Sequence, residues 1–217
     1  MDNQEHPLQD KWVLWEHRVG SDEESYTSNL SQIGNFSTVE GFFSYVKNMP
    51  WPSSWFYTRD EKRLRLGGRD VVGFSCFKEG IQPCWEDPQN IDGGEWRIRK
   101  FNSLQYVDDA WKFCALMCIG NNYPEGLNIT GCRVVDSSNS SKGRAMYNVE
   151  VWFSDTDDYD QVRNMISEAT GTVCSRMFYR RHSEDNENKE IKVDNTKAPN
   201  KHYSKNGRRT HKPRKAH

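Results

Sequence analysis

The sequence of 217 residues is long enough for one domain of about 150–200 residues with its own hydrophobic core. It contains 8 Trp, 9 Tyr and 10 Phe, so much of that core is expected to be aromatic. The net charge of -1 hides a split, because residues 1–182 carry 20 basic against 26 acidic side chains and residues 183–217 carry 10 against 5. An acidic body disfavours non-specific coating of nucleic acid, which needs many phosphate contacts, so any nucleic-acid role is expected in a local site.

The two ends of the chain differ from its middle. Residues 183–217 have almost no large apolar side chains, so we expect a disordered polar and basic tail after a folded domain of residues 1–182. The basic stretch 201–217 fits either a nuclear-localisation or phosphate-binding patch, or a solubilising end. The acidic N-terminus lacks the apolar segment of a signal peptide, and no stretch approaches the ~20 apolar residues of a membrane span. We expect a cytoplasmic protein, with a nuclear location as a further possibility, and no membrane partner.

The six cysteines are expected to be reduced thiols, because the chain shows no secretion signal. Cys114 and Cys118 lie four apart, but no His or Cys group with zinc spacing accompanies them. The sequence therefore predicts neither a metal nor a cofactor.

In chain order, residues 11–19 have the aromatic and β-branched content of a strand, and a polar loop is expected after it. Residues 37–49 predict a helix with apolar residues at helical spacing; Ser37 and Glu40 form a capping box at its start. Residues 51–70 lack a sustained hydrophobic period and are expected to form a long loop that is inserted into the fold.

Two further helices are predicted at 108–120 and 157–171, each ending in glycine. Strands are expected at 71–77, 93–101, 130–136, 147–153 and 172–179. Four tryptophans in these regular elements are expected in the core: Trp12, Trp15, Trp96 and Trp111. Strands that alternate with three separated helices predict an α+β domain, an antiparallel sheet with helices on one face. The other face is then free to form a concave, aromatic-lined binding surface.

Trp85 and Glu86 are adjacent in the turn-rich segment 80–88, between two predicted strands. Their side chains suit a flat cationic base such as N7-methylguanine. The ring attracts such a base by stacking and cation–π interaction, at about 1–3 kcal/mol per base for stacking alone. The carboxylate accepts hydrogen bonds from the base's N1–H and 2-amino groups. A Trp-Glu pair on its own arises often by chance, so the pair needs support from elsewhere in the chain.

That support comes from five ordered motifs: "HPLQDKWVLW", "STVEGFF", "FKEGIQPCWEDPQN", "GGEW" and "DDAWKFCALMCIG". With these motifs the chain, from His6 to about His182, resembles the cap-binding eukaryotic translation initiation factor 4E family. The resemblance implies a curved antiparallel sheet of about eight strands with three helices on its convex face. It also implies that a monomer binds the 7-methylguanosine 5′ cap of mRNA in the concave face, without catalytic residues or cofactor.

The resemblance implies two groups of cap-binding residues. The cap base is implied to contact Tyr26, Trp85, Glu86 and Trp152, and the cap phosphates to contact Lys142, Arg144 and Arg133. Tyr26 stands where the commonest members have tryptophan, so cap binding is expected to be weaker than theirs. Asn148 stands where a lysine is common, and Glu95 where Arg or Lys is usual, which places an acid near the entrance to an anion site.

The same resemblance implies a partner site on the convex helices for a scaffold initiation factor or a 4E-binding regulatory protein, at His6, Pro7, Val39, Phe43, Leu116 and Gly120. Phe43 replaces a tryptophan that usually anchors the partner peptide. Two functions stay open: an initiation factor that recruits a scaffold, and a cap-binding repressor like the homologous-protein branch of the family. Tyr26 is typical of that branch, whereas Trp12 is typical of the main one. An enzyme is disfavoured, because the sequence shows no P-loop, Cys/His dyad or metal-spaced carboxylate pair.

Overall fold

The computed structural model describes residues 5–19, 26–49, 51–52, 65–66, 69–121, 123–138, 146–155, 157 and 159–183. Its strands are β1 (Pro7–Arg18), β2 (Leu30–Thr38), β3 (Arg65–Leu66), β4 (Arg69–Lys78), β5 (Gly94–Ile98), β6 (Ile129–Asp136), β7 (Tyr147–Phe153) and β8 (Met177–Arg181). Its α-helices are α1 (Val39–Asn48), α3 (Leu104–Gly120) and α4 (Tyr159–Thr170), with 3₁₀ turns at Tyr26–Asn29 and Cys174–Arg176. The predicted tail lies outside these residues except for Ser183, and so does most of the predicted insertion.

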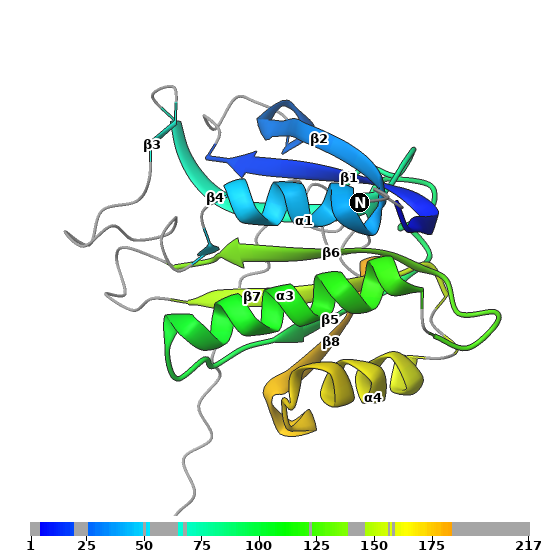
Figure 1. Ribbon diagram of the computed structural model, residues 1–217. Helices are drawn as coiled ribbons and strands as arrows, with labels where there is room; N and C mark the ends of the chain where they lie inside the picture. The colour runs from blue at the N-terminus through cyan, green and yellow to red at the C-terminus, as the bar shows by residue number, and fades with distance from the viewer. Residues whose placement is uncertain are drawn as a thin grey trace, which may run out of the picture.

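The described strands form one sheet in the order β2-β1-β4-β6-β7-β5-β8, and the short β3 pairs with β4. Every pair is antiparallel. The three helices cover one face of this sheet, with α3 crossing its centre (Figure 1). The predicted α+β class, an antiparallel sheet of about eight strands with three helices on one face, is confirmed.

Strand β7 shows how the sequence separates the two faces. Its odd-numbered residues from Tyr147 to Phe153 join the hydrophobic core beneath the helices. Because successive side chains of a strand point to opposite faces, Asn148, Glu150 and Trp152 lie on the other face. That face is where any binding site not covered by the helices has to lie.

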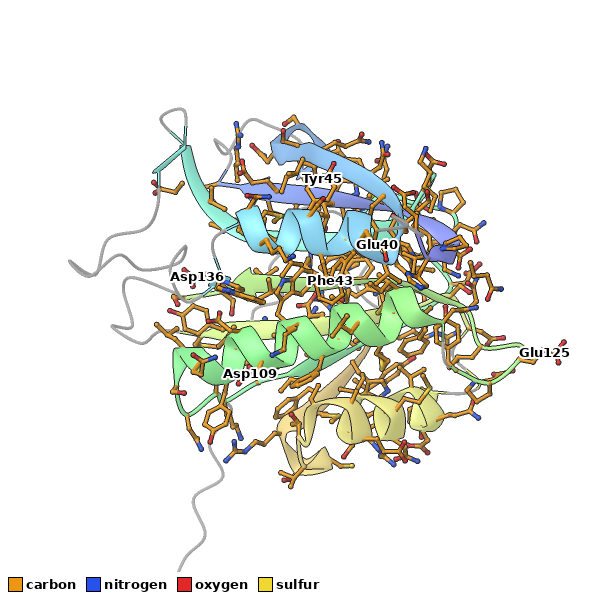
Figure 2. The ribbon with its side chains drawn as sticks, in the orientation of Figure 1. Glu40, Phe43, Tyr45, Asp109, Glu125 and Asp136 are labelled. Atoms are coloured by element: carbon orange, nitrogen blue, oxygen red, sulfur yellow. The ribbon has the colours of Figure 1, made fainter. Side chains whose placement is uncertain are left out.

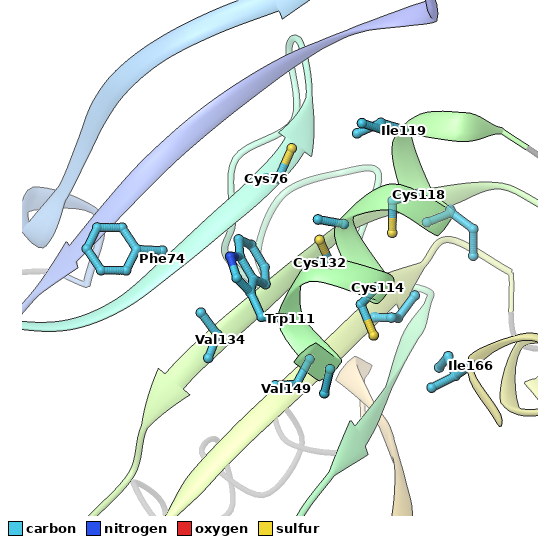
Figure 3. Close-up of a cluster of buried hydrophobic side chains, with 14 of the residues drawn as sticks. Phe74, Cys76, Trp111, Cys114, Cys118, Ile119, Cys132, Val134, Val149 and Ile166 are labelled. Carbon is cyan, nitrogen blue, oxygen red and sulfur yellow. The ribbon is translucent and has the colours of Figure 1, made fainter. Parts of the chain in front are cut away.

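The core beneath the helices is rich in sulfur and aromatic rings. Cys114 and Cys118 of α3 are fully buried near Cys76 and Cys132 of the sheet (Figure 3). Burial raises the pKa of Cys76, Cys114 and Cys132 well above the ordinary thiol value, so these thiols are unreactive packing groups. All six cysteines are free. Of the tryptophans predicted in the core, Trp12, Trp96 and Trp111 are buried, and Trp15 is half-buried.

The segment between β1 and α1 differs from the prediction. Strand β2 lies where the sequence predicted a polar loop, because it is an edge strand that pairs only with β1 and buries one side chain, Phe36. Thr38, not Ser37, caps α1: its extended backbone places its hydroxyl 3.1 Å from the amide of Gly41. Glu40 accepts hydrogen bonds from His6 and does not close a capping box.

Helix α3 is longer than predicted, because it begins at Leu104 rather than at residue 108. The extra turn adds Leu104 and Val107 to the face that packs on the sheet. The last predicted strand begins late, since Cys174–Arg176 forms a 3₁₀ turn before β8.

Candidate functional site

A cavity of about 380 Å³ opens on the sheet face opposite the helices. Five of the seven residues predicted to contact the cap line it: Tyr26, Trp85, Glu86, Arg133 and Trp152. They come from the 3₁₀ turn before β2, the loop after β4, and strands β6 and β7. The other two, Lys142 and Arg144, lie outside the described residues. The fold therefore brings together residues that are up to 126 positions apart in sequence, and their roles stay predictions.

The loop that carries Trp85 and Glu86 is held by two side chains of its own. The Asp87 carboxylate accepts hydrogen bonds from the amides of Gln82 (2.8 Å) and Gln89 (2.9 Å). The buried Asn90 amide donates to the carbonyls of Gln82 (2.9 Å) and Cys84 (3.0 Å). These bonds close the loop on both sides of Trp85 and fix its backbone, as Asp and Asn side chains commonly do in turns.

His182 ties that loop to the sheet. Its ring is fully buried, and its Nδ1 donates to the Asn90 carbonyl at 2.6 Å, because a carbonyl only accepts. The ring stacks against Trp85, with centroids 6.4 Å apart, and contacts Trp152 at 4.5 Å. The Arg180 guanidinium lies 4.0 Å from the Trp85 ring centroid. The end of β8 thus supports both tryptophans of the site.

The floor of the cavity contains an ion pair set by strand register. Arg133 of β6 lies directly opposite Glu150 of β7, and its Nε and Nη2 are 2.8 and 2.7 Å from Glu150 Oε2. Its guanidinium also lies over the Trp152 ring at 4.9 Å, and the Trp152 indole donates to Glu150 at 3.2 Å. Burial alone would lower the pKa of Arg133, but the facing Glu150 raises it, so this guanidinium is charged. Burial raises the pKa of Glu150, and Arg133 opposes that rise. A phosphate could reach Arg133 only in competition with Glu150.

The network continues across β5. Arg97 is paired with Glu150 across the β5–β7 ladder and places its Nε 3.4 Å from Glu150 Oε1. Its other end contacts the fully buried Glu95, which Arg180 approaches at 3.9 Å. Burial alone would raise the pKa of Glu95, but His182 and the nearby guanidinium groups hold it below the ordinary value. Contrary to expectation, Glu95 does not line the cavity and is not an acid at its entrance, because it is fully buried and paired with arginines.

Tyr26 is half-exposed, at 46%, yet its hydroxyl is held from two sides. Arg133 Nη1 lies 2.8 Å from the Tyr26 oxygen, and His17 Nδ1 lies 3.1 Å from it. His17 Nε2 is 2.8 Å from Ser75 Oγ. Burial and the positive charge of Arg133 lower the pKa of His17 well below its ordinary value, so the imidazole is neutral.

The predicted partner residues lie at the N-terminal end of β1 and on α1 and α3. His6 is exposed and bound through its backbone and ring to Glu40 at the start of α1. Those hydrogen bonds lower the pKa of Glu40 to about 2. Phe43 is 39% exposed on α1 (Figure 2). Pro7 and Gly120 are also exposed, and Val39 and Leu116 are half-buried.

Several residues of this site were missed by the sequence analysis: His17, Asp87, Asn90, Glu150 and His182. Asp87 and Asn90 carried a usable signal, because "WEDPQN" is rich in turn formers. Glu150 carried another, since the strands predicted at 130–136 and 147–153 follow one another along the chain, and antiparallel pairing of the two places Glu150 opposite Arg133. His17 and His182 gave none, because their roles depend on tertiary contacts, with Ser75 58 positions from His17 and Asn90 92 positions from His182.

Two classes of feature are not seen in the described part of the chain. None of its helices is long and apolar enough to cross a membrane. Its His, Cys, Asp and Glu side chains form no group of three or more that could hold a metal ion.

Comparison with known proteins defines the class. The family model described as "Eukaryotic initiation factor 4E" matches residues 7–197. Eukaryotic translation initiation factor 4E-2 of Schizosaccharomyces pombe is 32% identical over 156 residues, 71% of this chain and 56% of that protein. Factor 4E-1 of Arabidopsis thaliana is 34% identical over 131 residues, 59% of this chain and 49% of that protein. The chain thus spans about half the length of these relatives.

Solved structures agree in fold. The Ascaris suum eIF4E-3 complex with the m2,2,7G cap has a TM-score of 0.67 at 25% identity, covering 82% of this chain and 92% of that one. The C. elegans eIF4E-3 complex with the 4E-binding protein Mextli and cap analog has a TM-score of 0.67 at 24% identity, covering 85% and 96%. These structures share the α+β fold of this chain. The chain belongs to the eukaryotic initiation factor 4E family.

Proposed function

We propose that this protein binds the 7-methylguanosine 5′ cap of mRNA in the cavity on the uncovered sheet face. The observation that carries the proposal is that Tyr26, Trp85, Glu86 and Trp152 all line this one cavity. The Tyr26 and Trp85 rings supply stacking surfaces for a cationic base, and Glu86 accepts hydrogen bonds from the guanine edge. The Ascaris suum eIF4E-3 structure, which has a similar fold and is a complex with the m2,2,7G cap, supports cap binding by this chain.

The cap phosphates are proposed to bind at the arginine-rich side of the cavity. Arg18, Arg97, Arg133 and Arg180 line it, and Lys142 and Arg144 stay candidates from the sequence. Arg133 and Arg97 are engaged by Glu150, so their positive charge is largely compensated. We therefore expect the base to contribute more of the affinity than the phosphates do. Affinity for 7-methyl-GMP should then approach that for 7-methyl-GTP.

Calorimetric titration with 7-methyl-GTP and with GTP tests the proposal. The wild-type protein is expected to bind the methylated nucleotide selectively, because only that base carries the charge that strengthens stacking. Trp85→Ala removes a stacking contact of about 1–3 kcal/mol and should weaken binding by roughly 5- to 150-fold. Glu86→Gln keeps the shape of the side chain but replaces one acceptor oxygen by a donor, so guanine recognition should fall sharply.

Glu125→Gln is the matched control, because Glu125 is an exposed carboxylate on the loop after α3 (Figure 2) and does not line the cavity. It should bind 7-methyl-GTP like the wild type. Equal affinity of the wild type for methylated and unmethylated GTP would refute the proposed cap-binding function. Wild-type behaviour of Glu86→Gln would move the guanine site elsewhere.

A partner site on α1 and α3 is the second part of the proposal. The exposed Phe43 of α1 offers an apolar contact for a peptide helix from a scaffold initiation factor or a 4E-binding regulatory protein. The C. elegans structure of similar fold contains such a binding protein, Mextli. The protein is proposed to act as a monomer in the cytoplasm, without catalysing a reaction.

Initiation and repression are separated by what the protein recruits. Retention on immobilised 7-methyl-GTP, followed by mass spectrometry of the co-eluting proteins, decides between them. Recovery of a scaffold together with a helicase supports an initiation factor. Recovery of decay or silencing factors supports the alternative, a cap-binding repressor. Phe43→Ala should release either class of partner while the protein itself stays on the resin.

A further inference from the structure

Tyr26 takes part in a hydrogen-bond chain whose direction follows from chemistry alone. Arg133 can only donate, so Nη1 donates to the Tyr26 oxygen at 2.8 Å. The Tyr26 hydroxyl proton is then available for His17 Nδ1 at 3.1 Å. A neutral imidazole that accepts at Nδ1 carries its proton on Nε2, which donates to Ser75 Oγ at 2.8 Å. Every member of the chain Arg133–Tyr26–His17–Ser75 therefore has a consistent role.

The arginine at the head of this chain is itself fixed. Glu150 holds two of its nitrogens, and the Trp152 ring lies beneath the guanidinium at 4.9 Å. Arg133, His17 and Ser75 are all buried. The half-exposed Tyr26 ring is thus attached through its hydroxyl to a rigid part of the sheet, even though it belongs to a short 3₁₀ turn.

We propose that Arg133 and His17 are positioning residues that hold the Tyr26 ring in the cavity wall before ligand binds, so that the hydroxyl, and not only the ring, is needed for binding. This inference rests on the proposed cap-binding function. A wall that is already in place loses less conformational entropy when the base stacks on it. Tyrosine is then the residue that this site requires, and it is not a weaker substitute for tryptophan.

The proposal predicts that a larger ring at position 26 does not bind the cap more tightly. Tryptophan has the larger stacking face, but its indole N–H is a donor only and cannot accept from Arg133. Tyr26→Trp should therefore bind 7-methyl-GTP at least threefold more weakly than the wild type. Tyr26→Phe keeps the ring and loses only the hydroxyl, which should weaken binding by about three- to tenfold, the range expected for one or two net hydrogen bonds. Tyr26→Ala, which loses the ring as well, should be weaker still.

Calorimetry on these variants is compared with Tyr106→Phe, which removes a hydroxyl from an exposed tyrosine of α3 outside the cavity and should leave binding unchanged. Because Tyr26 is half-exposed, none of its variants is expected to prevent folding, and a thermal melt checks this. Binding by Tyr26→Phe within twofold of the wild type, or tighter binding by Tyr26→Trp, would overturn the proposal.

A second measurement needs no ligand and separates this inference from the cap-binding function. Nitrogen NMR of the His17 ring should show a neutral imidazole protonated at Nε2, with an Nδ1 signal that moves in Tyr26→Phe and not in Tyr106→Phe. A ring protonated at Nδ1, or an Nδ1 signal unaffected by Tyr26→Phe, would overturn the positioning role. If these signals are as expected but the wild type does not prefer methylated GTP, then the cap-binding function fails and the positioning of Tyr26 stands.

Discussion

The two aromatic walls of the cavity are held by different means. Trp85 lies in a loop whose fixing groups, Asp87 and Asn90, are within five residues of it in sequence. Tyr26 is fixed by Arg133 and His17, of which the first is 107 positions away and is itself held by another strand. The Trp85 wall is therefore fixed mainly within its own loop, with His182 and Arg180 at the end of β8 packed against the ring. The Tyr26 wall depends on the pairing of β6 with β7.

This difference shows where each wall is vulnerable. A change within the Trp85 loop breaks a few hydrogen bonds and leaves the sheet intact. A change in the ion pair beneath Tyr26 leaves a charge uncompensated in the sheet, so it affects the stability of the whole domain as well as the wall.

Removal of Glu150 should have the largest effect. Glu150→Ala leaves the buried Arg133 without its main counter-charge, and breaking such a buried pair costs about 3–5 kcal/mol. The free energy of unfolding, measured by urea denaturation, should fall by that amount. The control is Asp160→Ala, which breaks the exposed pair with Arg163 in α4 and should cost less than about 1 kcal/mol. Equal losses in the two variants would mean that the buried Arg133–Glu150 pair contributes no more to stability than an exposed pair.

Asn90→Ala tests the local wall and should have a smaller effect. The substitution removes the two hydrogen bonds that the Asn90 amide donates to the carbonyls of Gln82 and Cys84. The free energy of unfolding should fall by about 1–3 kcal/mol. The Trp85 loop should loosen, so affinity for 7-methyl-GTP should fall together with stability. Gln89→Ala is the control, because Gln89 is exposed in the same loop and uses only its backbone amide there. If calorimetry shows unchanged binding by Asn90→Ala, other groups fix the position of Trp85.

The same contrast explains how much could be predicted from the sequence. Trp85 and Glu86 are adjacent, and the turn formers that hold them lie in the same quoted stretch, so this part of the site could be proposed directly. The strand at 147–153, which carries Trp152, was likewise predicted from the sequence. The attachment of Tyr26 could not be predicted, because it depends on the register of β4, β6 and β7. It also depends on the edge strand β2, which the sequence analysis did not predict because its composition is polar.

Acid titration of stability tests the neutral histidine that receives the Tyr26 hydroxyl. His17 has a pKa well below its ordinary value of 6.5 in the folded protein. Below pH 6.5 the unfolded chain therefore binds a proton at this residue that the folded protein does not, and the free energy of unfolding falls as the pH falls. The loss due to His17 is at most about 1.4 kcal/mol per pH unit and stops at the folded pKa.

His17→Gln isolates this contribution, because the amide still donates and accepts but does not titrate in this range. Urea denaturation at pH 7.5 and at pH 5.5 should show a larger loss of stability for the wild type than for the variant. Equal losses would mean that the His17 pKa is the same in the folded protein as in the unfolded chain, which contradicts a buried ring held neutral as the acceptor of the Tyr26 hydroxyl. The Tyr26 hydroxyl would then be held by Arg133 alone, and the two walls would differ less than the structure indicates.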